Sequence, residues 1–412
     1  MHRAYFGTEI HRPLSDPMTM KDRRGSVVPN VHSLLDALRD PSPVAGLTHK
    51  FYRYPARFSP QFVERVISSF TQPGDLVMDP FAGGGTTLVE ALASGRRALG
   101  FDINALSAFI ATAKTTPIGK TDTKMLGIWL DELRADRRLQ SRPSAPLELN
   151  DYHRNVPWWI RSSIHLALES ISDLDNERQQ RFARAVVLRT AQWALDGRRE
   201  LPSSKEFRRQ AWTYGMEMLL GIEEFATRLS SAFGTKAFHE LLSENRKLVD
   251  GSIDQKRQQL SAKWQKPKLI LTSPPYWDVH ILYHRWQVQG RRETPAPYWI
   301  TDTLDGHGAG HYTFGGRNKK DKSEYLSFVS NCFSAIKECM SNETVMVQLV
   351  GFSNPTIQMP LYLKALESVG LEEMTQAKLG QRDVIWRDVP QRKWYTTSNH
   401  ASREFMLLHR RR

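Results

Sequence analysis

The chain has 412 residues, 40% of them hydrophobic, and carries a formal net charge of +13 with a pI of about 9.7. This length predicts one elaborated α/β domain or two smaller ones with a buried core. The chain contains no apolar run near the ~20 residues of a membrane span, and its N-terminus lacks the continuous apolar core of a signal peptide. Cys332 and Cys339 indicate neither a disulfide framework nor a metal site and fit a reducing cytoplasm. The charge favours a polyanionic partner, although many basic proteins bind none.

An aromatic and basic loop follows an N-terminal arm. The arm, residues 1–46, predicts a short helix over 31–39 and then a loop rich in proline. Residues 49–60 include Tyr54 and Phe58, and Ser59 followed by Pro60 is typical of a helix start. Taken alone, this pattern indicates a surface loop that leads into a core helix.

The next stretch has the order strand, glycine loop, helix, strand and acid. After a buried strand predicted at 76–78 comes Asp79-Pro80-Phe81-Ala82-Gly83-Gly84-Gly85-Thr86-Thr87. Glycines let the backbone approach a ligand and reach positive φ, and the absence of a Walker lysine disfavours nucleotide hydrolysis. A second strand predicted at 98–101 ends at Asp102, where a carboxylate can accept both hydroxyls of a ribose. This order predicts a nucleoside-binding unit.

A second motif, Ser273-Pro274-Pro275-Tyr276, follows the short apolar run at 269–271. Two prolines can continue neither a central strand nor a helix, so the chain leaves the sheet at the carboxyl end of a strand, where open α/β sheets bind ligands. The Ser273 hydroxyl, the Pro274 carbonyl and the Tyr276 ring would hold a planar, amine-bearing ring such as a nucleobase. A proline-rich turn after a strand is also a common feature without chemistry.

Together the two motifs resemble those of amino-group DNA methyltransferases, in the serine form associated with cytosine N4. The resemblance covers about 47–106 and 247–299, with a looser C-terminal match. It implies a doubly wound, mainly parallel, Rossmann-like α/β sheet that binds S-adenosylmethionine. It implies a catalytic role for Ser273, Pro274, Pro275 and Tyr276. It implies cofactor contacts from Tyr54, Phe58, Asp79, Pro80, Phe81, Gly83, Gly85, Thr86, Asp102 and Asp250.

Within that set, the resemblance gives Asp102 the ribose, and gives Asp79 and the glycine loop the amino-acid part of the cofactor. Tyr54 and Phe58 lie in the segment that packs over the methionine end. Asp250 would contact the adenine, although here the aspartate precedes the glycine, which departs from the family pattern.

The remaining segments complete a predicted division into four parts: the arm 1–46, a cofactor part 47–116, a mostly helical insertion 117–245 and a catalytic part 246–412. The insertion is rich in arginine and tryptophan, so it either contacts DNA or has buried tryptophans and a solvated basic face. Near the C-terminus, helices at 325–340 and 361–369 and strands at 344–350 and 404–408 are expected to complete the sheet.

Candidate DNA-binding cations lie after the proline pair. Guanidiniums beside aromatic side chains suit phosphates and stacked bases, but a charged helix explains the stretch 283–294 equally well. The glycine-rich run 306–320 predicts a mobile basic loop. His307 and His311 within it lack the rest of a ligand set, so we expect no metal. The candidate cations are Arg285, Arg291, Arg292, Arg317, Lys319 and Lys320.

The sequence therefore predicts a methyltransferase acting on the N4 amine of cytosine in double-stranded DNA, after the base flips out of the duplex. The resemblance also implies a bacterial or archaeal cytoplasm and a cognate restriction endonuclease as a candidate partner. The alternatives are N6-adenine methylation, RNA amine methylation and an inactive DNA-binding regulator. The Ser273 hydroxyl can donate to cytosine N3, but adenine N1 lies in the same relation to its amine. The choice of base therefore depends on the resemblance.

Overall fold

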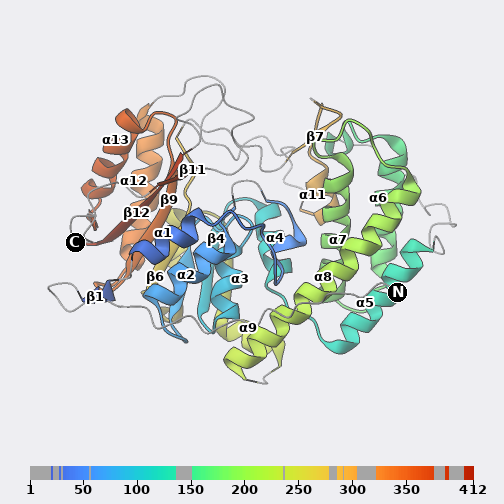
Figure 1. The fold of residues 1–412 in the computed structure, drawn as a ribbon, viewed down its shortest axis with the longest axis horizontal. Coiled ribbons are helices and arrows are strands. Elements are labelled where there is room, and N and C mark those ends of the chain that lie inside the picture. Colours follow the sequence, from blue (N-terminus) through green and yellow to red (C-terminus); the bar gives the residue numbers. More distant parts are fainter. Residues whose placement is uncertain are drawn as a thin grey trace, which may run out of the picture.

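The fold is built on one mainly parallel sheet (Figure 1). A computed structural model describes residues 20–21, 27–28, 31–54, 57–135, 151–234, 237–277, 285–290, 292–303, 322–374, 386–388 and 403–412. The strand order is β10 (Leu371–Glu373), β12 (Arg403–Arg411), β9 (Val345–Gly351), β6 (Leu269–Thr272), β3 (Leu76–Asp79), β4 (Arg97–Asp102) and β5 (Arg246–Asp250), with β11 (Trp386–Asp388) also paired to β12. Strands β9 to β5 in this order are parallel, and β12 is antiparallel to β9. This order confirms the predicted fold class.

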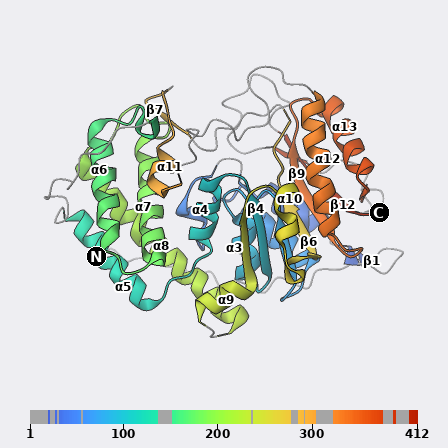
Figure 2. The same cartoon turned by 180° about the vertical axis from the view of Figure 1, so that it is seen from behind.

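Alternating side chains of the strands feed two cores, because successive residues point to opposite faces. In β3, Val77 belongs to one core, while Leu76 and Met78 belong to the other. Helices α2 (Pro60–Phe70), α3 (Thr86–Ala93) and α4 (Ala105–Lys114) cover the first face. Helices α10 (Ile253–Lys256), α12 (Lys322–Cys339) and α13 (Pro355–Ser368) cover the second, and α10 and α12 lie in front of the sheet in Figure 2.

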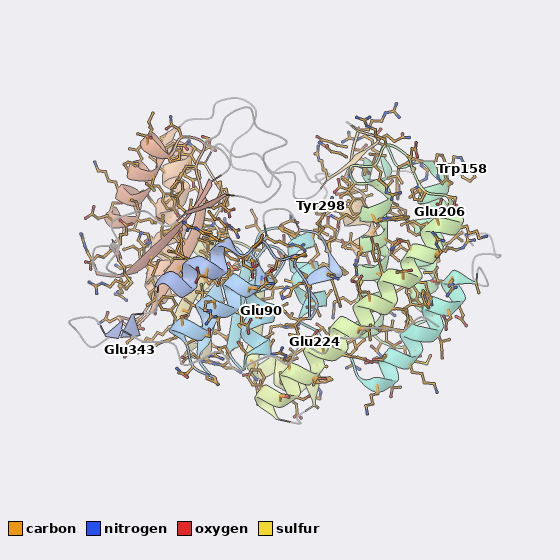
Figure 3. The ribbon with its side chains drawn as sticks, viewed as in Figure 1. Glu90, Trp158, Glu206, Glu224, Tyr298 and Glu343 are labelled. Carbon is orange, nitrogen blue, oxygen red and sulfur yellow. The ribbon has the colours of Figure 1, made fainter. Side chains whose placement is uncertain are left out.

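A group of helices stands beside the sheet, in the predicted insertion (Figure 1). It contains α5 (Lys120–Arg134), α6 (Trp158–Glu169), α7 (Glu177–Leu195), α8 (Ser204–Phe233) and α9 (Phe238–Asn245). Trp159, Trp193 and Trp212 pack against its core, whereas Trp158 is 70% exposed at the outer end (Figure 3). Among the described helices of the chain, none is both long and apolar enough to cross a bilayer. Most of the insertion's tryptophans therefore serve its core.

Three local expectations need correction or refinement. The strands β7 (Trp286–Val288) and β8 (Arg292–Thr294) pair as a hairpin, where a charged helix was the alternative expectation. Gln289 and Gly290 both have positive φ, which suits a tight hairpin turn. Helix α13 begins at Pro355 and continues through Pro360, earlier than the predicted start at 361. Helix α2 begins at Pro60 as predicted, but the Ser59 hydroxyl bonds Gln61 Oε1 instead of capping the backbone.

Shorter elements complete the described part. They are α1 (Val31–Arg39), as predicted, α11 (Ala296–Thr301), the strand pair β1 (Met20–Lys21) and β2 (Val27–Val28), and the 3-10 turns η1 (His49–Phe51), η2 (Asp151–His153), η3 (Ser170–Asp173), η4 (Arg257–Gln259) and η5 (Ala262–Trp264).

Helix α8 is docked onto the chain that leads to the cofactor part. The backbone N–H of Leu47 donates to Glu224 Oε2 at 3.0 Å. One helical turn earlier, Gly221 lies so close that an added Cβ would be 2.2 Å from the Leu47 carbonyl oxygen. Figure 3 shows Glu224 and Glu90, which bonds His49, together where the helices meet the sheet. Glycine at 221 is therefore required by this close approach.

We expect Gly221→Ala to destabilise the fold and Gly127→Ala to stabilise it. Both glycines lie inside helices, but Gly127 on α5 has open space around its Cα. Alanine there should therefore raise the free energy of unfolding by about 0.5–1 kcal/mol, whereas at 221 the clash should lower it by more than that. Urea unfolding of the two variants measures both effects. Equal effects of the same sign would show that α8 is not held against Leu47.

Candidate active site

The glycine loop is tied to Asp102 across two neighbouring strand ends. The Asp102 carboxylate accepts from the backbone N–H of Gly83 at 2.7 Å and of Asn104 at 2.9 Å, one on each oxygen. The side chain of Ser107 is a third hydrogen-bond partner of this carboxylate, and the acceptor capacity that remains is available to a ribose hydroxyl. Burial raises the pKa of Asp102 to about 6. The acceptors of this site therefore fit the predicted nucleoside.

The glycines of the loop are required by geometry. Gly83 and Gly85 have φ of +49° and +73°, and Gly85 precedes the first residues of α3, Thr86 and Thr87. A Cβ on Gly84 would be 2.9 Å from Tyr54 Cβ, and one on Gly85 would be 2.8 Å from Ala111 Cβ. The loop is thus pressed between the Tyr54 segment and α4.

Tyr54 and Phe58 both lie buried next to this loop, in the segment that the resemblance places over the cofactor. The Tyr54 hydroxyl is 2.6 Å from Ser107 Oγ of α4, and the Phe58 ring packs on Phe62 of α2 at 6.1 Å. The same segment is hydrogen-bonded to the helical insertion: the side-chain amide of Gln192 on α7 both accepts from Arg53 N and donates to Arg53 O, each at 3.0 Å. The Tyr54 segment therefore joins the glycine loop to α7.

Lys114 is a functional candidate that the sequence patterns do not single out. It ends α4, is completely buried, and donates from Nζ to the Gly84 carbonyl at 2.9 Å. Burial, together with the charge of Arg57, lowers the pKa of Lys114 to about 7. A lysine in a buried position usually has a specific partner. Here that partner is the backbone of the glycine loop.

Asp79 links the glycine loop to the Ser-Pro-Pro-Tyr strand. Its Oδ1 accepts from Phe81 N at 3.1 Å and from Thr272 Oγ1 at 2.7 Å, and its Oδ2 accepts from Thr87 Oγ1 at 2.8 Å. The side chain is 2% exposed, and burial raises its pKa to about 6. Thr272 directly precedes Ser273, so Asp79 fixes the end of β6 relative to the loop. Its three bonds are structural, and direct contact with a cofactor remains a prediction.

The Ser-Pro-Pro-Tyr turn has a defined hydrogen-bond pattern. Ser273 Oγ donates to the Tyr276 hydroxyl at 2.9 Å, which donates to Glu404 Oε1 at 2.7 Å. The Tyr325 hydroxyl donates to the Pro275 carbonyl at 2.9 Å. Pro274 and Tyr276 are buried, while Ser273 and Pro275 are partly exposed. The turn is therefore rigid, and its serine is accessible.

The carboxyl ends of β4 and β5 add a second acid. Asp250 pairs with Asp102 in the parallel register, and Gly251 N donates to the Asp102 carbonyl at 2.8 Å. Asp250 is exposed, as is Ile103, whose side chain is 47% accessible directly after Asp102. An apolar side chain left open beside two carboxylates suits the face of a purine. Its position after the acid is the sequence signal that could have identified it.

Beyond these strand ends, a cavity of about 480 Å³ lies between α10 and α12. The ring of Phe328, which lines it, packs on the Phe81 ring with a centroid distance of 6.2 Å, which links this cavity to the glycine loop. Pro80 is buried before Phe81. Within the described part of the chain, histidine, cysteine and acidic side chains form no group of three that could hold a metal ion.

Two of the six predicted DNA-binding cations belong to the part of the chain that the structure describes. Arg285 pairs with Glu293 at 3.0 Å, so its charge is partly compensated, and Arg292 is exposed on β8. Arg291, Arg317, Lys319 and Lys320 lie outside the described residues, as do His307 and His311.

Part of this chain is similar in sequence to known methyltransferases. Residues 8–112, which include β3, the glycine loop and Asp102, match the DNA methylase family of N6 and N4 methyltransferases. Type II methyltransferase M.MvaI of Kocuria varians is 33% identical over 139 residues, 32% of this chain and 30% of that protein. These matches support an amino-methyltransferase. They also support S-adenosylmethionine as the cofactor of the site.

Two further relatives carry different names, and one of these names specifies adenine as the methylated base. Type II methyltransferase M2.DpnII of Streptococcus pneumoniae is 33% identical over 101 residues, 24% of this chain and 32% of that protein. DNA adenine methyltransferase YhdJ of Escherichia coli K12 is 40% identical over 58 residues, 14% of this chain and 20% of that protein. The chain thus spans about a third or less of the length of these relatives, and the matches leave cytosine and adenine unresolved.

Among solved structures, TrmN from Thermus thermophilus aligns with a TM-score of 0.34 and 9% identity over 86% of this chain and 49% of that one. The fold assignment rests on the strand order described above.

We expect cofactor affinity to fall about tenfold between pH 7 and pH 5. The ionised form of Asp102 accepts the ribose hydroxyls, so with a pKa of about 6 the binding-competent fraction is lost as the pH falls through that value. Calorimetric titration with S-adenosylmethionine measures the profile. Asp102→Asn should bind weakly with a flat profile, and a flat profile in the native protein would remove Asp102 from the site.

We expect Lys114→Met to weaken cofactor binding by about tenfold, or ~1.4 kcal/mol, because the Gly84 carbonyl loses its donor. The free energy of unfolding should change little, since removal of a buried ammonium offsets the loss of its hydrogen bond. Calorimetry and thermal unfolding measure the two effects separately. Lys124→Met, exposed on α5, is the control. Parallel losses of affinity and stability would assign Lys114 to the fold alone.

Proposed function

We propose that this chain methylates the exocyclic N4 amine of cytosine in duplex DNA, as the modification enzyme of a restriction-modification system. The observation that carries the proposal is the hydrogen bond between Thr272 and Asp79 at 2.7 Å. It joins the glycine loop and the Ser-Pro-Pro-Tyr turn, which follow the adjacent strands β3 and β6. A cofactor in the first would lie beside a base in the second.

In this proposal the cofactor is S-adenosylmethionine, which supplies a methyl group on a sulfonium centre. Asp102 holds the ribose, Ile103 and Asp250 lie beside the adenine, and the N-terminus of α3 with the glycine loop accommodates the carboxylate end. Tyr54 and Phe58 cover the loop and exclude water. These roles use the polar and apolar groups as they lie in the structure.

The target amine must first leave the duplex, because in the helix it is paired and its ring is stacked. Ser273 Oγ and the Pro274 carbonyl then accept the two amine hydrogens, and the ring of Tyr276 lies against the base. Holding both hydrogens fixes the direction of the nitrogen lone pair toward the methyl group, and this placement would supply most of the acceleration. The C–N bond would form as the C–S bond of the sulfonium breaks, the thioether product would leave, and the surplus proton of the amine would pass to water. A covalent nucleophile is not needed, and Cys332 and Cys339 are buried in α12.

Several features support duplex DNA as the substrate. The net charge is +13, and relatives carry the names of type II methyltransferases. The exposed Arg292, the basic run 317–320 and the insertion 117–245 are candidates for phosphate contacts. A cognate endonuclease and a cytoplasmic setting belong to the same proposal.

N6-adenine is the second candidate, favoured by the match to the adenine enzyme YhdJ. Cytosine is preferred because the first position of the motif is Ser273, the form that resembles the cytosine enzymes. Both amines need two acceptors, so the hydrogen-bond pattern at the turn serves either base.

We expect DNA from cells that express the protein to contain N4-methylcytosine, measured by nucleoside mass spectrometry. Ser273→Ala should remove most of the product by loss of one acceptor, while Ser172→Ala, an exposed serine of the helical insertion, should leave it unchanged. Methyladenine alone would replace cytosine with adenine as the target. Transfer only to RNA, or cofactor binding without any transfer, would replace the proposal by the RNA enzyme or by an inactive regulator.

A further inference from the structure

Three strands place one row of residues behind the Ser-Pro-Pro-Tyr turn. Arg387 of β11 lies opposite Glu404 of β12, and Glu404 lies opposite Gly351 of β9. Residues directly opposite in antiparallel pairs share a face of the sheet. At Gly351 that face is open because the residue has no side chain, and a Cβ there would be 2.7 Å from Tyr276 Cδ2. The Tyr276 ring therefore fills this space, with its hydroxyl beside Glu404.

The buried ion pair in this row fixes the direction of the tyrosine hydroxyl. Arg387 donates Nε to Glu404 Oε2 at 2.8 Å, and its Nη2 lies 2.7 Å from the same oxygen. The two side chains are only 9% and 4% exposed. A carboxylate paired with an arginine is ionised and can only accept hydrogen bonds. The single proton of the Tyr276 hydroxyl must therefore point at Glu404 Oε1, 2.7 Å away.

Because Tyr276 donates its proton to Glu404, the direction of the hydrogen bond between Ser273 and Tyr276 is also fixed. The Tyr276 oxygen has no second proton to give, so in the 2.9 Å contact with Ser273 it is the acceptor. The proton of Ser273 is thereby directed at the Tyr276 oxygen, and the oxygen of this partly exposed serine keeps its capacity to accept. The expectation that Ser273 donates to cytosine N3 does not fit this arrangement.

We propose that Arg387 and Glu404 are positioning residues that orient the chain of hydroxyls from Ser273 through Tyr276 and so make Ser273 an acceptor for an amine. This inference rests on the proposed amine methylation. An amine presents two N–H donors, and a serine proton turned outward would leave one of them unsatisfied. With Glu404 in place, the pocket favours an amine over a carbonyl oxygen at the same position. The hydrogen-bond direction that Arg387 and Glu404 impose on Tyr276 and Ser273 thus favours an amine as the group that is methylated.

The test is a double-mutant cycle on methyl transfer, because a pair that acts through a third residue shows non-additive effects. Glu404→Gln should lower kcat by roughly 10–100-fold while the cofactor dissociation constant stays unchanged, since hydrogen bonds to charged groups have this magnitude. In the Ser273→Ala background the same substitution should change kcat by less than about twofold. Independent effects that multiply would overturn the inference, because a merely structural Glu404 affects both backgrounds alike.

A matched control is an ion pair between β12 and its other neighbour, β10. Glu372 of β10 pairs with Arg410 of β12 at 3.0 Å, so Glu372→Gln makes the same chemical change at an ion pair remote from Tyr276 in the strand register. Its kcat should equal that of the native protein. A loss as large as that of Glu404→Gln would overturn the inference, since the effect would then come from the sheet edge.

The test also covers a Glu404→Gln variant that does not fold and a native protein that is inactive. If Glu404→Gln does not fold, Tyr276→Phe takes its place in the cycle, because it removes the hydroxyl and keeps the ring; additive effects with Ser273→Ala again overturn the inference. The cycle uses whichever base the native protein methylates. A native protein that transfers no methyl group would overturn the proposed function and the inference together, whereas an active protein with additive effects overturns the inference alone.

Discussion

The Asp79 carboxylate accepts hydrogen bonds from the glycine loop, from helix α3 and from the last residue of β6. Phe81 and Thr87 are close together in the chain, whereas Thr272 lies almost two hundred residues later. No other side chain described in the site contacts all three. A nearly inaccessible carboxylate is unfavourable unless its oxygens are satisfied, and here hydroxyl and backbone donors satisfy them. Together with the pairing of β3 and β6, this side chain therefore holds the glycine loop at a fixed distance from the Ser-Pro-Pro-Tyr turn.

The strand order explains why this junction is the place of the site. From β3 the chain proceeds to β4 and β5 on one side and then returns to β6 on the other. The carboxyl ends of β3 and β6 thus form the point at which the order reverses, and such points bind ligands in open α/β sheets. On the far side of β6, β9 and the antiparallel β12 bring Glu404 behind the turn. The sheet thus positions both the cofactor loop and the groups that orient the serine.

The sequence predicted those parts of the site whose residues are close together in the chain. The glycine loop, Asp102 and the Ser-Pro-Pro-Tyr turn each follow a short apolar strand, so pattern and turn chemistry were sufficient to place them at strand ends. Lys114, Glu404 and Arg387 escaped prediction, because their roles depend on contacts between distant segments. The hairpin at 286–294 was missed for a different reason: three-residue strands give too little alternation to exclude a helix.

At Asp79 and Ser273, the local sequence was not sufficient to predict the hydrogen-bond partners. Asp79 was expected to serve the cofactor, and the structure shows its oxygens engaged with protein donors. From the sequence, Ser273 could accept from an amine or donate to cytosine N3, and in the structure its hydroxyl donates to Tyr276. In both cases the hydrogen bonds seen in the structure depend on neighbours that the local sequence does not contain, and the roles toward a cofactor or a base stay predictions.

The segment that covers the glycine loop is also held from its outer side by the insertion. Gln192 of α7 brackets the Arg53 peptide, and Tyr52 accepts from Trp286 of the hairpin at 3.0 Å. A ligand that fixes α7 and the hairpin in this arrangement also orders the segment over the loop. Coupling free energies are reciprocal, so such a ligand and the cofactor raise each other's affinity by the same factor. Nucleic acid bound to the helices and cofactor bound at the strand ends would thus be thermodynamically linked, with residues 52–54 as the shared element.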